Sequence, residues 1–352
     1  MADTLIYQCP NCGAGLKFNA ENQNFECEFC LSSFLESDLK NESAEEKAKS
    51  KDKADKEFCD EMNEYVCPSC GAEITTDLNT VSSFCYYCHN PVILKGRLSG
   101  QMRPDRIVPF KYDKQSAKEI FLKFAKSKWF VPNDFFADSH ADMISGVYYP
   151  FWVTDADTDV SAEAKATRIR TWRTGNKRYT ETSVYSLRRD GDVHFEDIVT
   201  SAYSEEDKRM LEGILPYPSD ALLSFSMPYL SGFSAKKRTI ERENISAEVK
   251  QRMSDYASRI MQSTMNGYAT VDMQSCNVNI KKSHWEYSLF PIWILTYKSN
   301  KSKKNRVYTY AMNGHTGKVY GELPISKAKI AALFSSICAA ATAIAAVIGV
   351  LL

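Results

Sequence analysis

Residues 7–14 read YQCPNCGA, and residues 65–72 read YVCPSCGA. Each stretch opens a set of four cysteines with the spacing C-x2-C-x14-C-x2-C. The first set is Cys9, Cys12, Cys27 and Cys30, and the second is Cys67, Cys70, Cys85 and Cys88. Because all four cysteines of the second set follow those of the first at one constant shift, the sequence predicts an internal repeat of two small domains.

Both cysteine sets have the composition of a zinc ribbon. Zinc favours four tetrahedral ligands, and two Cys-x-x-Cys turns at the ends of a β-hairpin supply four thiolates. Pro10 and Pro68 fix φ inside the first turn of each set, and Gly13 and Gly71 permit a positive φ there. We therefore predict two structural Zn²⁺ ions per chain. A redox Cys-x-x-Cys motif is the alternative, and four such pairs in two identical sets argue against it.

The composition changes along the chain in a way that predicts five segments. Residues 1–35 form the first ribbon, and residues 36–64, with 11 acidic residues and 6 lysines, form a charged linker. Residues 65–97 form the second ribbon, residues 98–325 a mixed α+β domain, and residues 330–352 a hydrophobic helix. The expected fold class is thus α+β, with two ribbons in front and a transmembrane helix behind.

Hydrophobic periodicity predicts the elements of the α+β domain. Helices are expected at residues 114–128, 204–213 and 246–265. Strands are expected at residues 147–159, 164–173, 179–187, 268–280, 285–297, 306–311 and 317–320. Turns are expected at residues 174–177, 190–192 and 313–314, where glycine follows or precedes asparagine, aspartate or threonine.

Residues 330–352 contain no charged residue, and Lys327 and Lys329 precede them. A helix of this length would span the ~30 Å hydrocarbon core of a bilayer. Positive flanks stay on the cytoplasmic side, so the expectation is a single-pass protein of the cell membrane with a cytoplasmic N-terminus. Small residues at every fourth position also suggest a homo-oligomer through this helix. A buried C-terminal helix is the alternative.

The charge distribution bears on nucleic acid binding. Residues 1–100 hold 9 Lys or Arg and 17 Asp or Glu, although the whole chain has no net charge. Acidic ribbons are poorly suited to phosphate, so nucleic acid binding by the ribbons is not expected. In the body, Arg168, Arg170 and Trp172 alternate and so share one face of a strand. These residues either contact an anionic partner or form the solvated face of a hairpin, and the second interpretation is favoured.

No constellation predicts catalysis. A closed four-cysteine site leaves no coordination position for water or substrate. Residues 314–318 read GHTGK, which lacks the spacing of a phosphate-binding loop. The histidines are scattered, and no nucleophile has a recognisable local partner. The chain is therefore expected not to be an enzyme.

The two ribbon motifs resemble the TFIIB-type zinc ribbons of a family of bacterial membrane proteins, which are often labelled as relatives of the primosomal helicase. The stretches at residues 290–293 (FPIW) and 313–318 (NGHTGK) are similar to features of the same family. The resemblance implies ribbons, an α+β domain and a hydrophobic segment in this order. It also implies protein partners at the membrane in envelope stress.

The predicted function follows from these observations and this resemblance. The chain is expected to be a membrane-tethered cytoplasmic adapter whose zinc ribbons bind protein partners and whose residues 330–352 lie in the lipid bilayer. The alternative is a nucleic-acid-binding ribbon protein of replication or transcription.

Overall fold

The computed structural model describes residues 7–39, 62–66, 73–77, 93–97, 103–132, 143–203, 205–230, 233–298, 307–321, 323 and 325–351. The second cysteine set (Cys67, Cys70, Cys85 and Cys88) lies outside these residues. The chain divides into two compact units. Unit 1 comprises residues 1–150, 203–237 and 289–352, and unit 2 comprises residues 151–202 and 238–288.

The first ribbon is a small antiparallel sheet in unit 1. Its four strands, in the order β1-β2-β3-β4, are Tyr7–Gln8, Gly15–Asn19, Asn24–Cys27 and Ser33–Phe34. A short helix, α1 (Glu36–Leu39), follows β4. The β2–β3 hairpin is the ladder between the two cysteine pairs, with Leu16 opposite Cys27 and Phe18 opposite Phe25. A β-hairpin thus lies between the two cysteine pairs, as their spacing predicts.

The other strands form one eleven-stranded sheet, whose order is β11-β8-β13-β9-β12-β6-β5-β7, with β10, β14 and β15 attached to its members. The strands are β5 (Met62–Val66), β6 (Glu73–Asp77), β7 (Ile93–Arg97), β8 (Arg106–Ile107), β9 (Ser145–Thr174), β10 (Lys177–Ser201), β11 (Leu223–Ser224), β12 (Ser234–Ala235), β13 (Thr270–Lys298), β14 (Val307–Asn313) and β15 (Val319–Gly321). The pairing of β12 with β9 is parallel, and the other register-defined pairs are antiparallel.

Within the described residues the helices are fewer than the strands. Besides α1 they are α3 (Lys114–Lys126), α5 (Glu205–Gly213), α6 (Arg242–Ser263) and α7 (Lys327–Leu351), with 3-10 turns η2 (Ser219–Ala221) and η3 (Met227–Leu230). The predicted α+β class is therefore wrong, because a single large mixed sheet dominates the described chain.

Three long strands explain much of this difference. β9 joins the two strands that were expected at residues 147–159 and 164–173, and β13 joins those expected at 268–280 and 285–297. Asp190-Gly191-Asp192 does not turn the chain, because β10 runs through it with Gly191 opposite Val160 in the ladder. The turn at residues 174–177 is confirmed, since β9 ends at Thr174 and β10 begins at Lys177.

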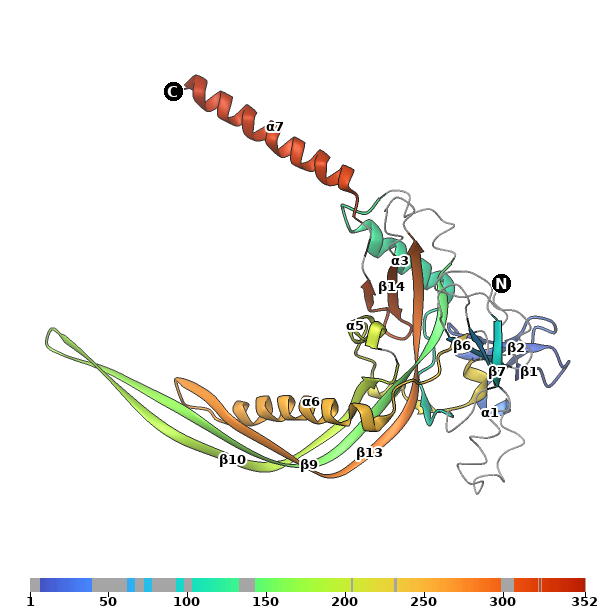
Figure 1. The fold of residues 1–352 in the computed structure, drawn as a ribbon, viewed down its shortest axis with the longest axis horizontal. Helices are drawn as coiled ribbons and strands as arrows, with labels where there is room; N and C mark the ends of the chain where they lie inside the picture. Colours follow the sequence, from blue (N-terminus) through green and yellow to red (C-terminus); the bar gives the residue numbers. More distant parts are fainter. Residues whose placement is uncertain are drawn as a thin grey trace. The chain divides into compact units, whose positions relative to one another are not determined.

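The core of unit 2 lies between these strands and α6, which runs along them (Figure 1). The helix buries Ile245, Val249, Met253, Ala257 and Met261, which recur every three or four residues and so form one stripe. Of these strands, β9 presents mostly small side chains to this stripe, namely Ala156, Val160, Ala162, Ala164 and Ala166. Alanines at these alternating positions let the helix approach the sheet closely.

Aromatic side chains build the core of unit 1. Phe110 stacks on Phe233 with centroids 4.0 Å apart, and Tyr148 and Trp293 meet Phe110 edge-on. Tyr149 and Phe290 are also fully buried. The aromatic stretches at residues 148–152 and 290–293 thus serve packing, as their sequence favours.

The C-terminal helix requires a second correction. Among the helices of the described residues, none is long and apolar enough to cross a membrane. The predicted transmembrane helix at 330–352, and with it the single-pass location in the cell membrane, is therefore contradicted.

Candidate metal centre

The four cysteines of the first ribbon meet at one point. The Sγ atoms of Cys9, Cys12, Cys27 and Cys30 all lie within 4.8 Å of one another. Cys9 and Cys30 are 3.5 Å apart, as are Cys12 and Cys27. These distances are too long for a disulfide, in which the sulfurs are about 2.05 Å apart. Four sulfurs about 2.3 Å from one tetrahedral ion would be about 3.8 Å apart, so the set can hold one metal ion.

The two turns that carry the cysteines have the same backbone geometry. In the first, the Cys9 N–H donates to Ala14 O (2.6 Å) and the Gly13 N–H donates to Cys9 O (2.8 Å). In the second, the Cys27 N–H donates to Ser32 O (2.9 Å) and the Leu31 N–H donates to Cys27 O (2.9 Å). We call residues 9–14 the first knuckle and residues 27–32 the second knuckle.

Both knuckles need a left-handed residue at the same place, directly after the second cysteine. Gly13 has φ 73° and Leu31 has φ 57°. Glycine adopts this conformation without a steric cost, whereas a residue with a Cβ is strained by about 1–2 kcal/mol. The sequence already contained this signal, because Leu31 stands four residues after Cys27 as Gly13 does after Cys9.

The thiols have unequal proton affinities when no cation is present. The hydroxyl and the backbone N–H of Ser32 lower the pKa of Cys30 to about 6. The backbone N–H of Ala14 lowers the pKa of Cys12, but desolvation and the three neighbouring thiols outweigh it and raise that pKa to about 12. Four thiolates in contact repel one another, so a bound cation is what would let all four ionise together.

The ribbon is packed against η3 of the same unit. Tyr229 meets Phe18 and Phe25 edge-on, with ring centroids 5.4 and 5.6 Å apart, and these two phenylalanines are 5.2 Å from each other. The Tyr229 hydroxyl donates to Glu36 Oε2 over 2.8 Å. Burial is the main cause that raises the pKa of Tyr229, and the Glu36 hydrogen bond adds to it. This contact joins residues 193 apart in sequence, and no local pattern predicts it.

One part of the ribbon stays uncovered by the rest of the structure. Phe29 and Leu31 of the second knuckle are 82% and 84% exposed, and Leu35, just after β4, is 59% exposed. Two carboxylates lie at this knuckle: Glu26 directly precedes it, and Glu28 lies within it. Glu28 pairs with Lys17 at 2.7 Å, and both side chains are largely exposed, so the pair adds little stability.

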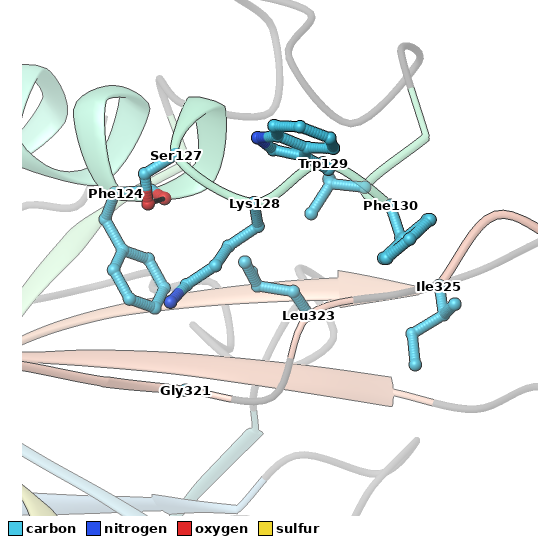
Figure 2. A pocket seen from close by; sticks show the side chains of 9 residues that line it. Phe124, Ser127, Lys128, Trp129, Phe130, Gly321, Leu323 and Ile325 are labelled. Carbon is cyan, nitrogen blue, oxygen red and sulfur yellow. Dashed lines mark hydrogen bonds between the residues drawn. The ribbon is translucent and has the colours of Figure 1, made fainter. Parts of the chain in front are cut away.

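A separate apolar pocket of about 460 Å³ lies beside α3 in unit 1. Figure 2 shows Lys128 reaching between Phe124 and Leu323, with Trp129 and Ile325 at the edge. The Lys128 ammonium lies 5.1 Å from the centre of the Phe124 ring. The Ser127 hydroxyl, also in the lining, donates to the backbone carbonyl of Phe124 over 2.6 Å.

The acidic residues that alternate on β9 are surface groups. Asp157 and Asp159 are exposed, and each pairs with a cation of unit 2: His194 Nδ1 is 2.6 Å from Asp157, and Lys281 Nζ is 2.6 Å from Asp159. Asp155 accepts the backbone N–H of Asp197. Alternation on the wet face of a strand accounts for them.

Comparison with known proteins places the chain among relatives. No family model matches it, and no solved structure matches it. The chain is 30% identical over 334 residues to the uncharacterized protein YdjG of Bacillus subtilis (strain 168), and the alignment covers 95% of this chain and 94% of YdjG. Since the similarity runs through nearly the whole of both proteins, the chain belongs to the same family as YdjG.

Proposed function

We propose that the first ribbon binds one structural zinc ion and presents the second knuckle to a protein partner, so that the chain acts as a non-enzymatic adapter. Zinc is the ion that four thiolates in a tetrahedron most commonly hold. With all four positions taken by sulfur, the ion has no site for water or substrate. Its role would be to fold the ribbon, because the free energy of zinc binding then contributes to the free energy of folding.

The same cysteine spacing in the second set supports a second zinc ion at Cys67, Cys70, Cys85 and Cys88. The chain would then carry two zinc ions, one in each ribbon. Each ion would fold its own ribbon, because no cysteine is shared between the two sets.

The observation that carries the adapter proposal is the exposed apolar pair of the second knuckle. Phe29 and Leu31 are almost fully in water, and Leu31 adopts a backbone conformation that disfavours any residue with a Cβ. A strained, exposed leucine contributes nothing to packing within the described structure. Apolar side chains that are costly to keep in water are typical of recognition surfaces.

The charge of the ribbon indicates what kind of partner it suits. Glu21, Glu26 and Glu28 outnumber Lys17 between residues 7 and 35. Phosphate groups would be repelled, so a protein is favoured over nucleic acid at this face. We expect the partner to present an apolar side chain to Phe29 and Leu31, with Lys or Arg nearby for the carboxylates.

The test compares two double variants of the full chain in affinity purification with quantitative mass spectrometry. Phe29→Ser with Leu31→Ser should lose specific partners, whereas Leu223→Ser with Ile325→Ser, at two other exposed positions, should keep them. A purified partner should then bind the knuckle variant at least about tenfold more weakly, as truncation of an anchor residue does. Equal recovery of all partners by both variants would count against the adapter role, provided that both variants retain their zinc.

A further inference from the structure

The strand pair β9–β10 extends beyond the rest of unit 2 as a two-stranded ribbon (Figure 1). β13 begins at Thr270, whose hydroxyl is 2.6 Å from that of Thr167 on β9, and Ala269 donates to Thr167 O. Among the described strands, only β9 and β10 take part in the ladder from Arg168 to Ser183, and they pair in unbroken register from Arg168↔Ser183 to Thr174↔Lys177. We call residues 168–183 the ribbon arm. At about 3.3 Å per residue, its seven residue pairs extend about 23 Å.

The ribbon arm is strongly basic. It holds Arg168, Arg170, Arg173, Lys177 and Arg178 against a single carboxylate, Glu181. All six side chains are exposed. Within the described structure none of the five cations takes part in an ion pair, including Arg170, which lies directly opposite Glu181 in the ladder. Five uncompensated cations on so short a segment repel one another, and an anionic ligand would relieve that repulsion.

The basic groups occur on both faces of the arm. Because side chains alternate along each strand and directly paired residues share a face, Arg168, Arg170 and Lys177 lie on the face that α6 covers further back. Arg173 and its partner Arg178 lie on the opposite face. A flat membrane surface can touch one face of a ribbon at a time. A groove between two phosphate backbones surrounds a ribbon, and the major groove of B-DNA, about 12 Å wide, admits a two-stranded ribbon.

The aromatic residues of the arm argue for a duplex rather than a single strand. Trp172 stacks on Tyr179 with centroids 5.6 Å apart and an interplanar angle of 15°. The guanidinium of Arg170 lies over the Trp172 ring, 5.8 Å from its centre. Because Tyr179 and Arg170 both contact its ring, only part of the Trp172 surface is open to an unpaired base. The turn, residues 174–177 (TGNK), carries no apolar side chain that would insert into a lipid layer.

We propose that the ribbon arm binds double-stranded DNA in a groove, through phosphate contacts that do not depend on sequence. Arg168 anchors the root of the arm, because its guanidinium lies 5.7 Å from the centre of the Tyr185 ring and 5.4 Å from that of Tyr268. The other four cations supply the phosphate contacts. This site is separate from the cysteine centre, so it does not rest on the proposed adapter role.

The experiment measures binding of the full chain to a labelled 30-base-pair duplex of random sequence by fluorescence anisotropy, over a range of salt concentrations. Each phosphate contact should contribute about −0.9 to the slope of log K against log salt concentration. The variant Arg173→Gln with Arg178→Gln should weaken binding at least about tenfold at low salt and reduce the slope by about 2. The control, Lys250→Gln with Lys282→Gln, removes the same charge from exposed positions of unit 2 and should leave both quantities unchanged.

Three results would overturn the proposal. The first is the absence of salt-dependent duplex binding by the wild-type chain at low salt. The second is an equal loss in the arm variant and the control, which would indicate general charge attraction. The third is arm-dependent binding that is tighter to a 30-nucleotide single strand, or to vesicles of phosphatidylcholine with 30% phosphatidylglycerol, than to the duplex. Equal thermal midpoints of both variants would exclude misfolding as the cause of a loss.

Discussion

A single residue in each knuckle of the ribbon determines how much backbone strain that knuckle carries. The two knuckles share their hydrogen bonds but not the residue at the left-handed position, where Gly13 is unstrained and Leu31 is strained. The left-handed conformation costs more free energy with Leu31 than it does with Gly13, and the Leu31 side chain does not pack against anything in the described structure. A change at Leu31 therefore separates the stability of the ribbon from its proposed recognition role.

Leu31→Gly should stabilise the ribbon and weaken partner binding at the same time. Relief of the left-handed strain is worth about 1–2 kcal/mol, and the greater freedom of glycine in the unfolded chain offsets about 0.5–1 kcal/mol of it. Amide hydrogen exchange of β2 and β3 measures the net effect. Leu35→Gly is the matched control, because Leu35 is also exposed but has no positive φ, and it should destabilise. Slower exchange in the control than in Leu31→Gly would show that the strain argument is wrong.

Cys12→Ser should remove one zinc ion per chain and unfold the first ribbon. A structural site of this type contributes about 10–16 kcal/mol of binding free energy, which the ribbon's small core cannot replace. Elemental analysis of the purified chain gives the count. Cys276→Ser is the control, because Cys276 is a half-buried thiol of β13 that lies away from the cluster, and its zinc content should equal that of the wild type.

His194 gives unit 2 a small pH dependence. The hydrogen bond with Asp157 raises the pKa of His194 against the opposing effect of desolvation, and the charges of Asp157, Glu196 and Asp155 act in the same direction as the hydrogen bond. The pair therefore contributes its full stability below the unfolded pKa of about 6.5 and loses it as pH rises through the higher folded pKa. Asp157→Asn should lower the pKa of His194 in an NMR titration. It should also lower the thermal midpoint at pH 5.5 more than at pH 8.5.

At the scale of elements, α6 holds the long strands together. Its buried stripe fits the alanines of β9, so a truncation there leaves a cavity between helix and sheet. Met253→Ala should cost about 2–5 kcal/mol, since Met253 is 1% exposed. Ile260→Ala on the same helix is the control, because Ile260 is 45% exposed, and it should change stability by no more than about 0.5 kcal/mol. Urea denaturation of the full chain measures both.

Helices could be predicted from the sequence better than long strands. The stripe of α6 and the Asp113 cap of α3, whose Oδ1 accepts the Ser116 N–H over 2.8 Å, are local signals. The continuity of β10 through Asp190-Gly191-Asp192 is not local. There Asp190 lies opposite Ser161 of β9 in the ladder, and Asp192 pairs with Lys281 of β13. Tertiary pairing thus keeps extended a triplet that by itself favours a turn.

The cysteine centre also has features that the local sequence predicts and features that depend on distant contacts. The spacing of Cys9, Cys12, Cys27 and Cys30 was sufficient to predict that they meet, because the chemistry of a ribbon is local to its hairpin. The docking of that ribbon on Tyr229 depends on a contact across most of the chain. The two-stranded arm likewise depends on where β13 begins. Periodicity indicated its basic face, but it did not show that β13 ends its pairing with β9 before the arm.

At the scale of the whole molecule, the metal centre and the α6 core belong to different compact units. All four cysteines lie in unit 1, whereas the buried stripe of α6 and its partners lie in unit 2. Aromatic contacts tie the ribbon to η3, which is also part of unit 1. A loss of zinc should therefore propagate within unit 1 and stop short of the α6 core.

Removal of zinc with a chelator tests this division in the full chain. Amides of β2 and β3 should lose their protection from hydrogen exchange, because the ribbon's folding free energy is its metal-binding free energy. Amides of α6 and of β10 between residues 192 and 201 should exchange at the same rate with and without chelator, since their hydrogen bonds and core contain no ligand of the ion. Met253→Ala should give the opposite pattern, with fast exchange in α6 and an unchanged zinc content. If chelation exposes α6 as well, the two units fold as one cooperative body, and the ribbon then stabilises the whole protein rather than its own surface.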